Sequence, residues 1–253
     1  MIGDDEGCKT KKSHWDEAWE SPIKPRLPSR LNVGVLNITR LLKKHVRPGS
    51  HYLEIGCAPG KMLAWVSSVL KAEATGLDYS ETGIMKCYSL FDALGVKITL
   101  YHADIFNHEI PSASFDVVAS FGVIEHFEDA RQVVQRHIDL VKPGGVALIT
   151  IPNYGGIYGV LQRWCDAPNL ALHNLSIMDY DSLRTLVVSP LESVHAYTFG
   201  SISPWLVSLN KRFPRFVANI ISLGINTVGL LQPWHIQAVS PMLVLEVHKG
   251  PSA

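Results

Sequence analysis

Short apolar runs alternate with amphipathic stretches through the middle of this chain. The apolar runs predict strands at residues 51–56, 74–77, 96–102, 115–120 and 146–151. Apolar residues at helical spacing between them predict helices at 61–70, 81–94 and 130–141. Strands that alternate with helices in this way pair in parallel, so we predict a doubly wound α/β sheet with helices on both faces. Ligands of such sheets bind at the carboxyl ends of the strands.

The segments on either side of this core are less regular. Residues 1–12 have the pattern of a mobile tail, the three prolines of 21–29 indicate a connector, and 153–178 has no clear periodicity. We predict further helices at 31–46 and 179–187, strands at 193–198 and 241–248, and an insertion with at least one apolar helix at 201–234. The chain thus divides into a tail with a helical flap (1–47), the α/β core (48–199), a helical lid or pocket insertion (200–236) and a final strand with a tail (237–253).

Composition excludes several classes of protein. With 253 residues and 47% apolar content the chain can bury a large core, which excludes global disorder. Its 23 basic and 23 acidic residues balance, which disfavours binding to nucleic acid. The four cysteines form no CxxC pair and the N-terminus has no secretory pattern, so we expect a cytoplasmic protein without a zinc site. The apolar stretch 216–231 is too short and too polar for a transmembrane span.

The densest chemical signal follows the first predicted strand, in the segment that runs from His51 to Gly60. The strand carries Glu54 and ends in Gly56-Cys-Ala-Pro-Gly60, which opens a helix. Glycine allows the backbone to turn tightly and to approach a ligand, and the first turn of a helix offers free N–H groups. An ordinary strand-to-helix turn has the same pattern, so this segment alone does not decide between the two.

The next two strands are also followed by carboxylates. Asp78 ends the second strand, where a carboxylate can bind both hydroxyls of a ribose. Asp104 follows the third strand, where it can accept a hydrogen bond from an adenine amino group. Each residue is also typical of a helix cap or a turn. Three acidic residues at three successive strands favour a nucleoside site over coincidence.

Taken in order, these motifs resemble the class I S-adenosylmethionine-dependent methyltransferases. The resemblance rests on Leu53-Glu-Ile-Gly-Cys-Ala-Pro-Gly60, Gly76-Leu-Asp-Tyr-Ser80, His102-Ala-Asp104, Phe115-Asp-Val-Val-Ala-Ser120 and Leu140-Val-Lys-Pro-Gly-Gly145. It covers roughly residues 45–190 and, weakly, the final strand. It implies a Rossmann-like, mostly parallel seven-stranded sheet with an N-terminal helical flap and a C-terminal helical insertion. It also implies S-adenosyl-L-methionine as cofactor and S-adenosyl-L-homocysteine as product.

The resemblance implies which residues bind the methionine part of the cofactor. The loop from Gly56 through Cys57 to Gly60 would hold that part, and Glu54 would support its amino group directly or through water. Ser120 and Phe121, at the end of the fourth strand, would line the side of the sulfonium and its methyl group.

The adenosine part is assigned in the same way. Asp78 would hold the ribose hydroxyls, and Tyr79 would lie against the adenine face. Asp104 would bind the adenine amino group, and the backbone N–H of Ile105 would reach a ring nitrogen.

The candidate catalytic residue is His126, in the segment Val123-Ile-Glu-His126. Methyl transfer needs alignment above all, and a base helps when the acceptor is a hydroxyl. Imidazole titrates near neutral pH and suits this role. The Glu125–His126 pair resembles that of the ubiquinone-pathway O-methyltransferases, but Gly122 stands where the metal-using members carry an acid, so we predict no metal. Alternatively, Glu125 and His126 orient their loop or bind the methionine end of the cofactor.

Aromatic and polar side chains outside the core suggest an acceptor pocket. The candidate substrate-binding residues are Trp15, Trp19, Asn153, Tyr154, Tyr158, Trp164 and His173, with Trp205, Trp234 and His235 further along the chain. Aromatic groups suit a flat or apolar acceptor, although each of them is also typical of core or lid packing.

We therefore predict a methyltransferase that moves a methyl group to an oxygen of a small aromatic or apolar metabolite in biosynthesis. Methylation of nitrogen or carbon, a lipid-linked acceptor, and a non-catalytic methyltransferase-like binding module remain alternatives. A nicotinamide-dependent oxidoreductase is a further one, disfavoured because no G-x-G-x-x-G is present. We expect a monomer or homodimer. Residues 205–234 mix basic and apolar side chains as interfacial helices do, but a lid over an apolar pocket is the favoured interpretation.

Overall fold

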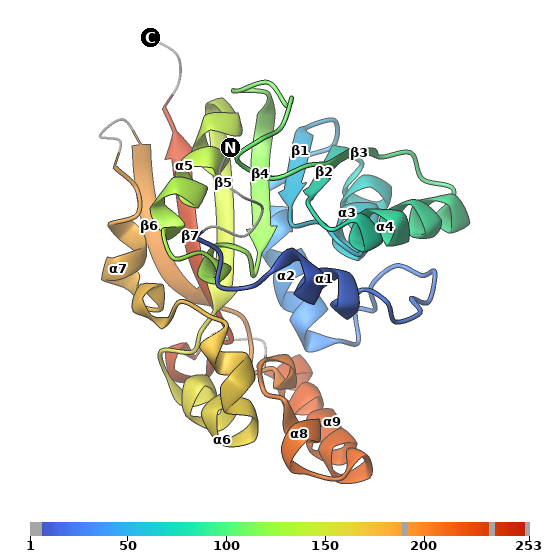
Figure 1. Ribbon diagram of the computed structural model, residues 1–253, viewed down its shortest axis with the longest axis vertical. Coiled ribbons are helices and arrows are strands. Elements are labelled where there is room, and N and C mark those ends of the chain that lie inside the picture. Colours follow the sequence, from blue (N-terminus) through green and yellow to red (C-terminus); the bar gives the residue numbers. More distant parts are fainter. Residues whose placement is uncertain (1–6, 189–191, 233–235, 251–253) are drawn as a thin grey trace.

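A computed structural model describes residues 7–188, 192–232 and 236–250, and it places one seven-stranded sheet at the centre of the molecule (Figure 1). The strand order is β3-β2-β1-β4-β5-β7-β6. The strands are β1 (His51–Ile55), β2 (Glu73–Asp78), β3 (Thr99–His102), β4 (Phe115–Phe121), β5 (Val141–Pro152), β6 (Glu192–Phe199) and β7 (Met242–Lys249). Strands β1 to β5 pair in parallel, and β7 runs antiparallel between β5 and β6. The predicted Rossmann-like sheet is confirmed.

Helices cover both faces of this sheet. They are α1 (Lys12–Ala18), α2 (Val33–His45), α3 (Lys61–Trp65), α4 (Glu81–Leu94), α5 (Ala130–Leu140), α6 (Ile157–Ala171), α7 (Tyr180–Arg184), α8 (Leu209–Arg212) and α9 (Arg215–Leu231). Short helices are η1 (Val66–Leu70), η2 (Ile124–His126), η3 (Leu175–Ile177), η4 (Pro204–Leu206) and η5 (Gln237–Val239). The core lies in two layers: α5 and α7 pack on one face, and α2, α3 and α4 pack on the other. Strand β1 contributes Leu53 to the first layer and Tyr52 to the second, because successive side chains of a strand point to opposite faces.

Local signals set the ends of α4 where the sequence predicts them. The Ser80 hydroxyl accepts the Gly83 N–H at 3.0 Å, which caps the first turn. Gly95 ends the helix in the left-handed conformation, with φ of 64°. This helix therefore starts directly behind the carboxyl end of β2, and its first turn faces the region where a ligand is expected.

Two predicted boundaries are wrong. The third strand begins at Thr99 rather than residue 96, because the Val96 N–H still bonds to the Phe91 carbonyl of α4. The fifth strand begins at Val141 rather than residue 146, because Val141 pairs with Phe115 of β4. The Pro-Gly-Gly segment 143–145, which the sequence predicts as a turn before the strand, therefore lies within it.

The N-terminal segment is docked on the core from residue 7 onward, contrary to the expectation of a mobile tail up to residue 12. Cys8 forms an isolated β-bridge with Phe127, and the Lys9 N–H donates to the His126 carbonyl at 2.7 Å. The following helix, α1, contacts α4. The segment therefore crosses the loop after β4 before the chain enters the connector 21–29.

The C-terminal third contains more helix than its sequence suggests. The segment 153–178, which lacks periodicity, forms α6 with a kink at Asp166, where φ is −156° and ψ is 72°. Helix α8 contacts both α6 and α9, and Figure 1 shows these three helices together at one end of the molecule. No helix in the described ranges is both long and apolar enough to cross a membrane.

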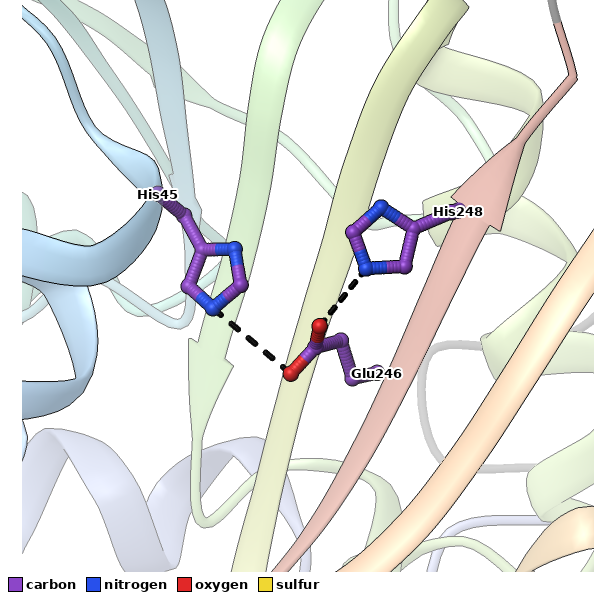
Figure 2. A group of neighbouring side chains, drawn as sticks. All are labelled: His45, Glu246 and His248. Carbon is purple, nitrogen blue, oxygen red and sulfur yellow. Dashed lines mark hydrogen bonds and ion pairs between the residues drawn. The ribbon is translucent and has the colours of Figure 1, made fainter.

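A cluster of polar side chains ties α2 to the sheet on the side remote from the ligand-binding loops. Figure 2 shows Glu246 of β7 between His45, at the end of α2, and His248. Its carboxylate oxygens lie 3.6 Å from His45 Nε2 and 2.6 Å from His248 Nε2, and the Tyr197 hydroxyl donates to it at 2.6 Å. Burial opposes the ionisation of Glu246, but the hydrogen bonds from Tyr197 and His248 outweigh burial and hold its pKa below the usual value. The Glu246 carboxylate is therefore ionised, and Tyr197 and His248 supply its hydrogen-bond partners.

Candidate active site

A cavity of about 900 Å³ opens at the carboxyl ends of β1, β2 and β4. The loops after four strands supply one part of its wall, namely Gly56, Ala58, Asp78, Tyr79, Asp104, Ile105, Phe106, Phe121, Gly122, Val123, Glu125 and His126. The flap and the C-terminal third supply the rest, with Trp15, Trp19, Tyr154, His173, Trp205 and Leu206 among them. Its size suits a small-molecule site, for which 300–1,000 Å³ is roughly typical.

Two positions in the loop after β1 require glycine. Gly56 has a φ of +69°, and a Cβ atom there would lie 2.6 Å from Val123 Cγ2. Gly60 has a φ of +84°, and a Cβ atom there would lie 2.8 Å from the Phe91 ring. Both positions combine a left-handed backbone with a contact that excludes any side chain. The loop therefore brings bare backbone to the cavity at Gly56.

Asp78 joins the two loops that form the floor of the cavity. One carboxylate oxygen accepts the Ala58 N–H at 2.9 Å, and the other accepts the Ser80 N–H at 2.9 Å. Burial raises its pKa from the usual value, and these two backbone hydrogen bonds oppose that rise. Each carboxylate oxygen can accept a second hydrogen bond, so Asp78 both holds the floor and presents acceptors to the cavity.

Asp104 closes the neighbouring edge of the same cavity. Its side chain accepts the Phe106 N–H at 2.7 Å, which shapes the turn after β3. Ile105, which is buried, and Tyr79 from the loop after β2 line the cavity beside it. The structure thus brings Asp78, Tyr79, Asp104 and Ile105 together, as the sequence predicts.

Four of the predicted cofactor residues lie behind the wall instead of lining it in the described part of the chain: Glu54, Cys57, Gly60 and Ser120. Glu54 is buried and accepts the Tyr52 hydroxyl at 3.2 Å, and burial raises its pKa to about 8. A hydrogen bond with Cys87, together with burial, raises the pKa of the Cys57 thiol, so this thiol is not a nucleophile at neutral pH. Ser120 is fully buried, whereas the next residue of β4, Phe121, does line the cavity.

Glu125 and His126 lie on η2, where the chain turns after β4. Glu125 is fully buried, and neither of its carboxylate oxygens has a hydrogen-bond partner among the described residues. Burial raises its pKa to about 8. Such an unpartnered buried carboxyl is costly, so its place in the cavity wall indicates a ligand that supplies the missing partner.

His126 is oriented by the backbone of the segment that follows α6. Its Nδ1 lies 3.2 Å from the Leu172 carbonyl, so Nδ1–H is the donor and the lone pair remains on Nε2. The ring centroid lies 4.8 Å from that of His173 and 5.0 Å from that of Trp15. Burial first, and the neighbouring His173 second, lower the pKa of His126 to about 3. The expectation that this imidazole titrates near neutral pH is therefore wrong, and it is neutral at pH 7.

One ligand atom each of Glu125, His126 and His173 lies within 4.8 Å of the others, a spacing that a metal ion could bridge. A Cβ atom at Gly122 would lie 3.2 Å from Glu125 Oε1, so the position that carries an acid in metal-using relatives is crowded here. The absence of a metal requirement stays a prediction.

The predicted acceptor residues divide into two groups. Trp15, Trp19, Tyr154 and His173 line the cavity. The other three do not line it: the Asn153 amide donates to the Ser240 carbonyl at 2.9 Å, the Tyr158 hydroxyl donates to the Val239 carbonyl at 3.0 Å, and Trp164 is 53% exposed. Trp234 and His235 fall outside the described residues. Trp205, which the sequence also suggests for the pocket, lines the cavity, together with Leu206 and Cys8, which no pattern in the sequence singles out.

Comparison with known proteins agrees with this geometry. Residues 53–149 match the protein-family model described as "Methyltransferase domain". A probable S-adenosylmethionine-dependent methyltransferase of Mycolicibacterium smegmatis is 32% identical over 109 residues, which are 43% of this chain and 40% of the relative. An O-methyltransferase of Pyrenophora dematioidea is 27% identical over 50% of this chain and 48% of its own length. Phosphoethanolamine N-methyltransferase 3 of Arabidopsis thaliana is 31% identical over 42% of this chain and 21% of its own length. The chain thus spans half or less of these relatives.

Solved structures share the fold at low identity. A Haemonchus contortus phosphoethanolamine N-methyltransferase 2 bound to phosphomonomethylethanolamine and S-adenosylhomocysteine has a TM-score of 0.58 and 17% identity, covering 85% of this chain and 52% of that one. The plantazolicin methyltransferase BpumL, in complex with a substrate analogue and S-adenosylhomocysteine, has a TM-score of 0.56 and 17% identity, covering 94% and 90%. The [4+2]-cyclase SpnF has a TM-score of 0.55 and 14% identity, covering 85% and 80%.

Proposed function

Since the core of this chain is a class I S-adenosylmethionine-dependent methyltransferase domain, we propose that the protein transfers a methyl group from S-adenosylmethionine to a small molecule bound in the 900 Å³ cavity. The observation that carries the proposal is the convergence of Gly56, Asp78 and Asp104 on one wall of that cavity. These residues come from three different loops, and together they offer bare backbone and two carboxylates at one site.

The residues present fit the cofactor. The Gly56 loop approaches without side chains and suits the methionine part, while Asp78 and Asp104 offer acceptors for the ribose hydroxyls and the adenine amino group. Glu54 lies behind the wall, so its support of the amino group would run through the Gly56 loop or through water. When bound, the cofactor supplies an electrophilic methyl group on a sulfonium.

The part of the cavity wall that the flap and the C-terminal third supply favours a flat or apolar acceptor. Trp15, Trp19 and Trp205 line it, together with Tyr154 and Leu206. Aromatic side chains provide a large apolar contact area with fixed geometry. Methyl transfer from a sulfonium gains much of its rate from alignment, which such a wall provides by restricting the acceptor.

Two side chains that line the cavity, those of His126 and Glu125 on η2, can take a proton from an acceptor hydroxyl. His126 is neutral at pH 7, and the bond from its Nδ1 to the Leu172 carbonyl leaves Nε2 as acceptor. Glu125 has a pKa of about 8, near the working pH, which is the better match for a general base. We propose His126 as the catalytic residue that binds the acceptor hydroxyl, with Glu125 as the second candidate base. The presence of these two groups supports an oxygen acceptor.

A nitrogen acceptor is the second candidate. The buried, unpartnered Glu125 could also pair with an amine, and one of the relatives is named as an N-methyltransferase. The fold also occurs in the [4+2]-cyclase SpnF, so fold alone does not establish methyl transfer. Acceptor chemistry therefore has to be measured.

Calorimetry with S-adenosylhomocysteine, S-adenosylmethionine and NAD tests the cofactor assignment. We expect both adenosyl ligands to bind and NAD to bind far more weakly. Transfer of labelled methyl from S-adenosylmethionine to matched sets of phenols, carboxylic acids and amines then tests the acceptor. Tighter binding of NAD contradicts the cofactor assignment. Adenosyl binding without transfer to any set favours a non-catalytic module.

A further inference from the structure

Helix α9 is apolar on both sides. Ala218 and Gly229 are buried against the protein, whereas Phe216, Leu223 and Leu231 on the outer side are 70%, 67% and 77% exposed. Asn226 fixes the rotation of the helix, because its side chain accepts the Val33 N–H and donates to the Leu31 carbonyl, both at 2.9 Å. The outer side of a helix on the surface of a globular protein is normally polar, so these exposed apolar side chains are unusual.

Helix α6 also exposes large apolar side chains. Its inner side buries Tyr158 and Leu170 together with Gln162, whose side-chain amide donates to Asn169 and Ser208 at 3.0 and 3.1 Å. Val160 and Trp164, on the outer side, are 71% and 53% exposed. Each such exposure forgoes the burial of apolar area, which costs free energy unless a partner covers the side chain.

Helices α6 and α9 lie at the same end of the molecule (Figure 1). Helix α8 joins them: Phe213, just after α8, contacts the Trp164 ring at 5.7 Å between centroids, and the Arg212 guanidinium lies 4.9 Å from that ring. We call the exposed residues Val160, Trp164, Phe216, Ile220, Leu223 and Leu231 the apolar face. Large exposed apolar areas of this kind mark surfaces that bind a membrane or another protein.

The charge of the three helices that carry the apolar face is mostly positive: α6, α8 and α9 contain Arg163, Lys211, Arg212 and Arg215 against one acidic residue, Asp166. Residues 201–232 contain Lys211, Arg212 and Arg215 and no acidic residue, although the whole chain has a net charge of zero. All three basic residues are exposed. Apolar side chains that enter a bilayer, flanked by lysine and arginine and by a tryptophan, are the pattern of helices that lie in the interface of anionic membranes.

We propose that the apolar face docks on the surface of an anionic lipid bilayer, with Phe216, Ile220 and Leu223 entering the interface and Lys211 and Arg215 binding lipid headgroups. Helix α9 has 17 residues and lies along the surface rather than across it. The outward side chains of α9 do not line the cavity, whereas Trp205 and Leu206 of the same insertion do.

Charge also decides against a second copy of the chain as the occupant. In a symmetric dimer through this face, the same surface of both copies would meet. Lys211, Arg212 and Arg215 would then approach their own counterparts, and Asp166, the one acidic residue of α6, α8 and α9, leaves an excess of basic charge in the interface. An anionic lipid surface supplies the missing negative charge.

The apolar face also borders the cavity. Trp205 of η4 lines the cavity and is half exposed, and η4 contacts α9. If the proposed function holds, an acceptor dissolved in the bilayer could reach the cavity past Trp205. The docking itself does not depend on that function.

Sedimentation of the full chain with vesicles tests the proposal. Vesicles of phosphatidylglycerol mixed with phosphatidylcholine should carry the protein down, and vesicles of phosphatidylcholine alone should carry down much less. A Phe216→Gln, Ile220→Gln, Leu223→Gln variant should partition at least about tenfold more weakly, because buried apolar area is lost. Lys211→Glu with Arg215→Glu should weaken binding by more than about tenfold, since each cation near the surface contributes about fivefold.

A matched control is Met85→Gln with Tyr88→Gln, which removes two exposed apolar side chains from α4 instead. It should bind vesicles like the parent. Binding of S-adenosylhomocysteine, measured on every variant, reports on the fold and on the proposed function separately from the docking. Absence of sedimentation with anionic vesicles overturns the proposal. So does a dimer in analytical ultracentrifugation that the triple glutamine variant converts to a monomer, because the apolar face would then be a protein interface.

Discussion

The hydroxyl of Ser80 donates to a carboxylate oxygen of Asp16 at 2.6 Å, and this bond joins the N-terminal flap to the first turn of α4. Ser80 follows Asp78 by two residues, and its own N–H is bound by that carboxylate. Trp15 precedes Asp16 in α1, and Trp19 directly follows that helix. Both tryptophans line the cavity. The position of the flap and the floor of the cavity are therefore linked through two adjacent hydrogen bonds.

Replacement of Asp16 by Ala should loosen the flap. A hydrogen bond to a charged group contributes about 1.5–3 kcal/mol, and partial exposure lowers that value, so we expect S-adenosylhomocysteine to bind about fivefold more weakly. The dissociation rate should rise more than the association rate falls. Stopped-flow tryptophan fluorescence measures both. Glu17→Ala, at an exposed neighbouring position, is the control and should leave both rates unchanged.

Asp78→Ala should cost about 2–3 kcal/mol of cofactor binding, because partners are left unpaired. Asp104→Ala should cost less free energy of cofactor binding. Asp104 would make one hydrogen bond, to the adenine amino group, whereas Asp78 would make two, to the ribose hydroxyls. Calorimetry with S-adenosylhomocysteine measures the difference. The matched control is Asp179→Ala, because Asp179 caps α7 by accepting the Ser182 N–H and does not line the cavity. Unchanged affinity in both cavity variants, with the fold intact, would contradict the crevice assignment.

His126→Ala should lower kcat by roughly 10²–10⁴-fold with nearly unchanged cofactor affinity, if His126 accepts the proton of an acceptor hydroxyl. Its pKa of about 3 means that the imidazole stays neutral down to acidic pH, so the rate should show no acid limb near pH 6.5. The pH dependence of kcat in the parent protein measures this. A variant with a kcat close to that of the parent removes His126 from the catalytic residues and favours an acceptor that is already ionised, such as a carboxylate.

If Glu125 rather than His126 is the base, the rate should depend on pH near neutrality. Only the ionised carboxylate accepts a proton, and its pKa is about 8, so the rate should rise as the pH rises toward 8. Glu125→Gln should abolish that rise while keeping the shape of the side chain. A pH profile that is the same in Glu125→Gln as in the parent would exclude this role.

The same residue should make stability fall with pH. The pKa of Glu125 is raised from 4.5 to about 8 in the folded state, so the folded protein binds the proton more tightly than the unfolded chain does. The resulting stability is complete below pH 4.5 and is lost as the pH rises to about 8, by up to about 5 kcal/mol. Glu125→Gln should remove this contribution to the slope, as measured by urea unfolding at several pH values. Glu54, with the same direction of shift, should retain a slope of its own, and Glu17→Gln should leave the whole slope unchanged.

Turnover should survive exhaustive chelation, because Gly122 stands where metal-using relatives carry an acid. The measurement is kcat before and after dialysis against a chelator, with magnesium restored in a parallel sample. Loss of activity that magnesium reverses would contradict this prediction. Glu125, His126 and His173, whose ligand atoms lie within 4.8 Å of one another, would then be tested as ligands by substitution.

Sequence patterns alone determined the α/β core and many of the strand-end residues that line the cavity. The strands of the core are buried on both faces and so appear as continuous apolar runs, and the ends of α4 are set by Ser80 and Gly95. Parallel strands place their carboxyl ends at one edge of the sheet, which is why Asp78 and Asp104 could be assigned to one site before the structure was known. These are local or periodic features, and a single chain displays them directly.

Only the tertiary structure decided the properties that depend on burial. Asn226 and Gln162 point inward because segments far away in the sequence supply their hydrogen-bond partners, and this leaves the apolar sides of α9 and α6 exposed. Leu206 and Cys8 line the cavity because η4 and the N-terminal segment pack there, and no pattern in the sequence singles out either residue. His126 has a pKa of about 3 because the flap and the segment after α6 exclude water from it. Desolvation is a sum over every segment that surrounds a group, and no local pattern of residues contains that sum.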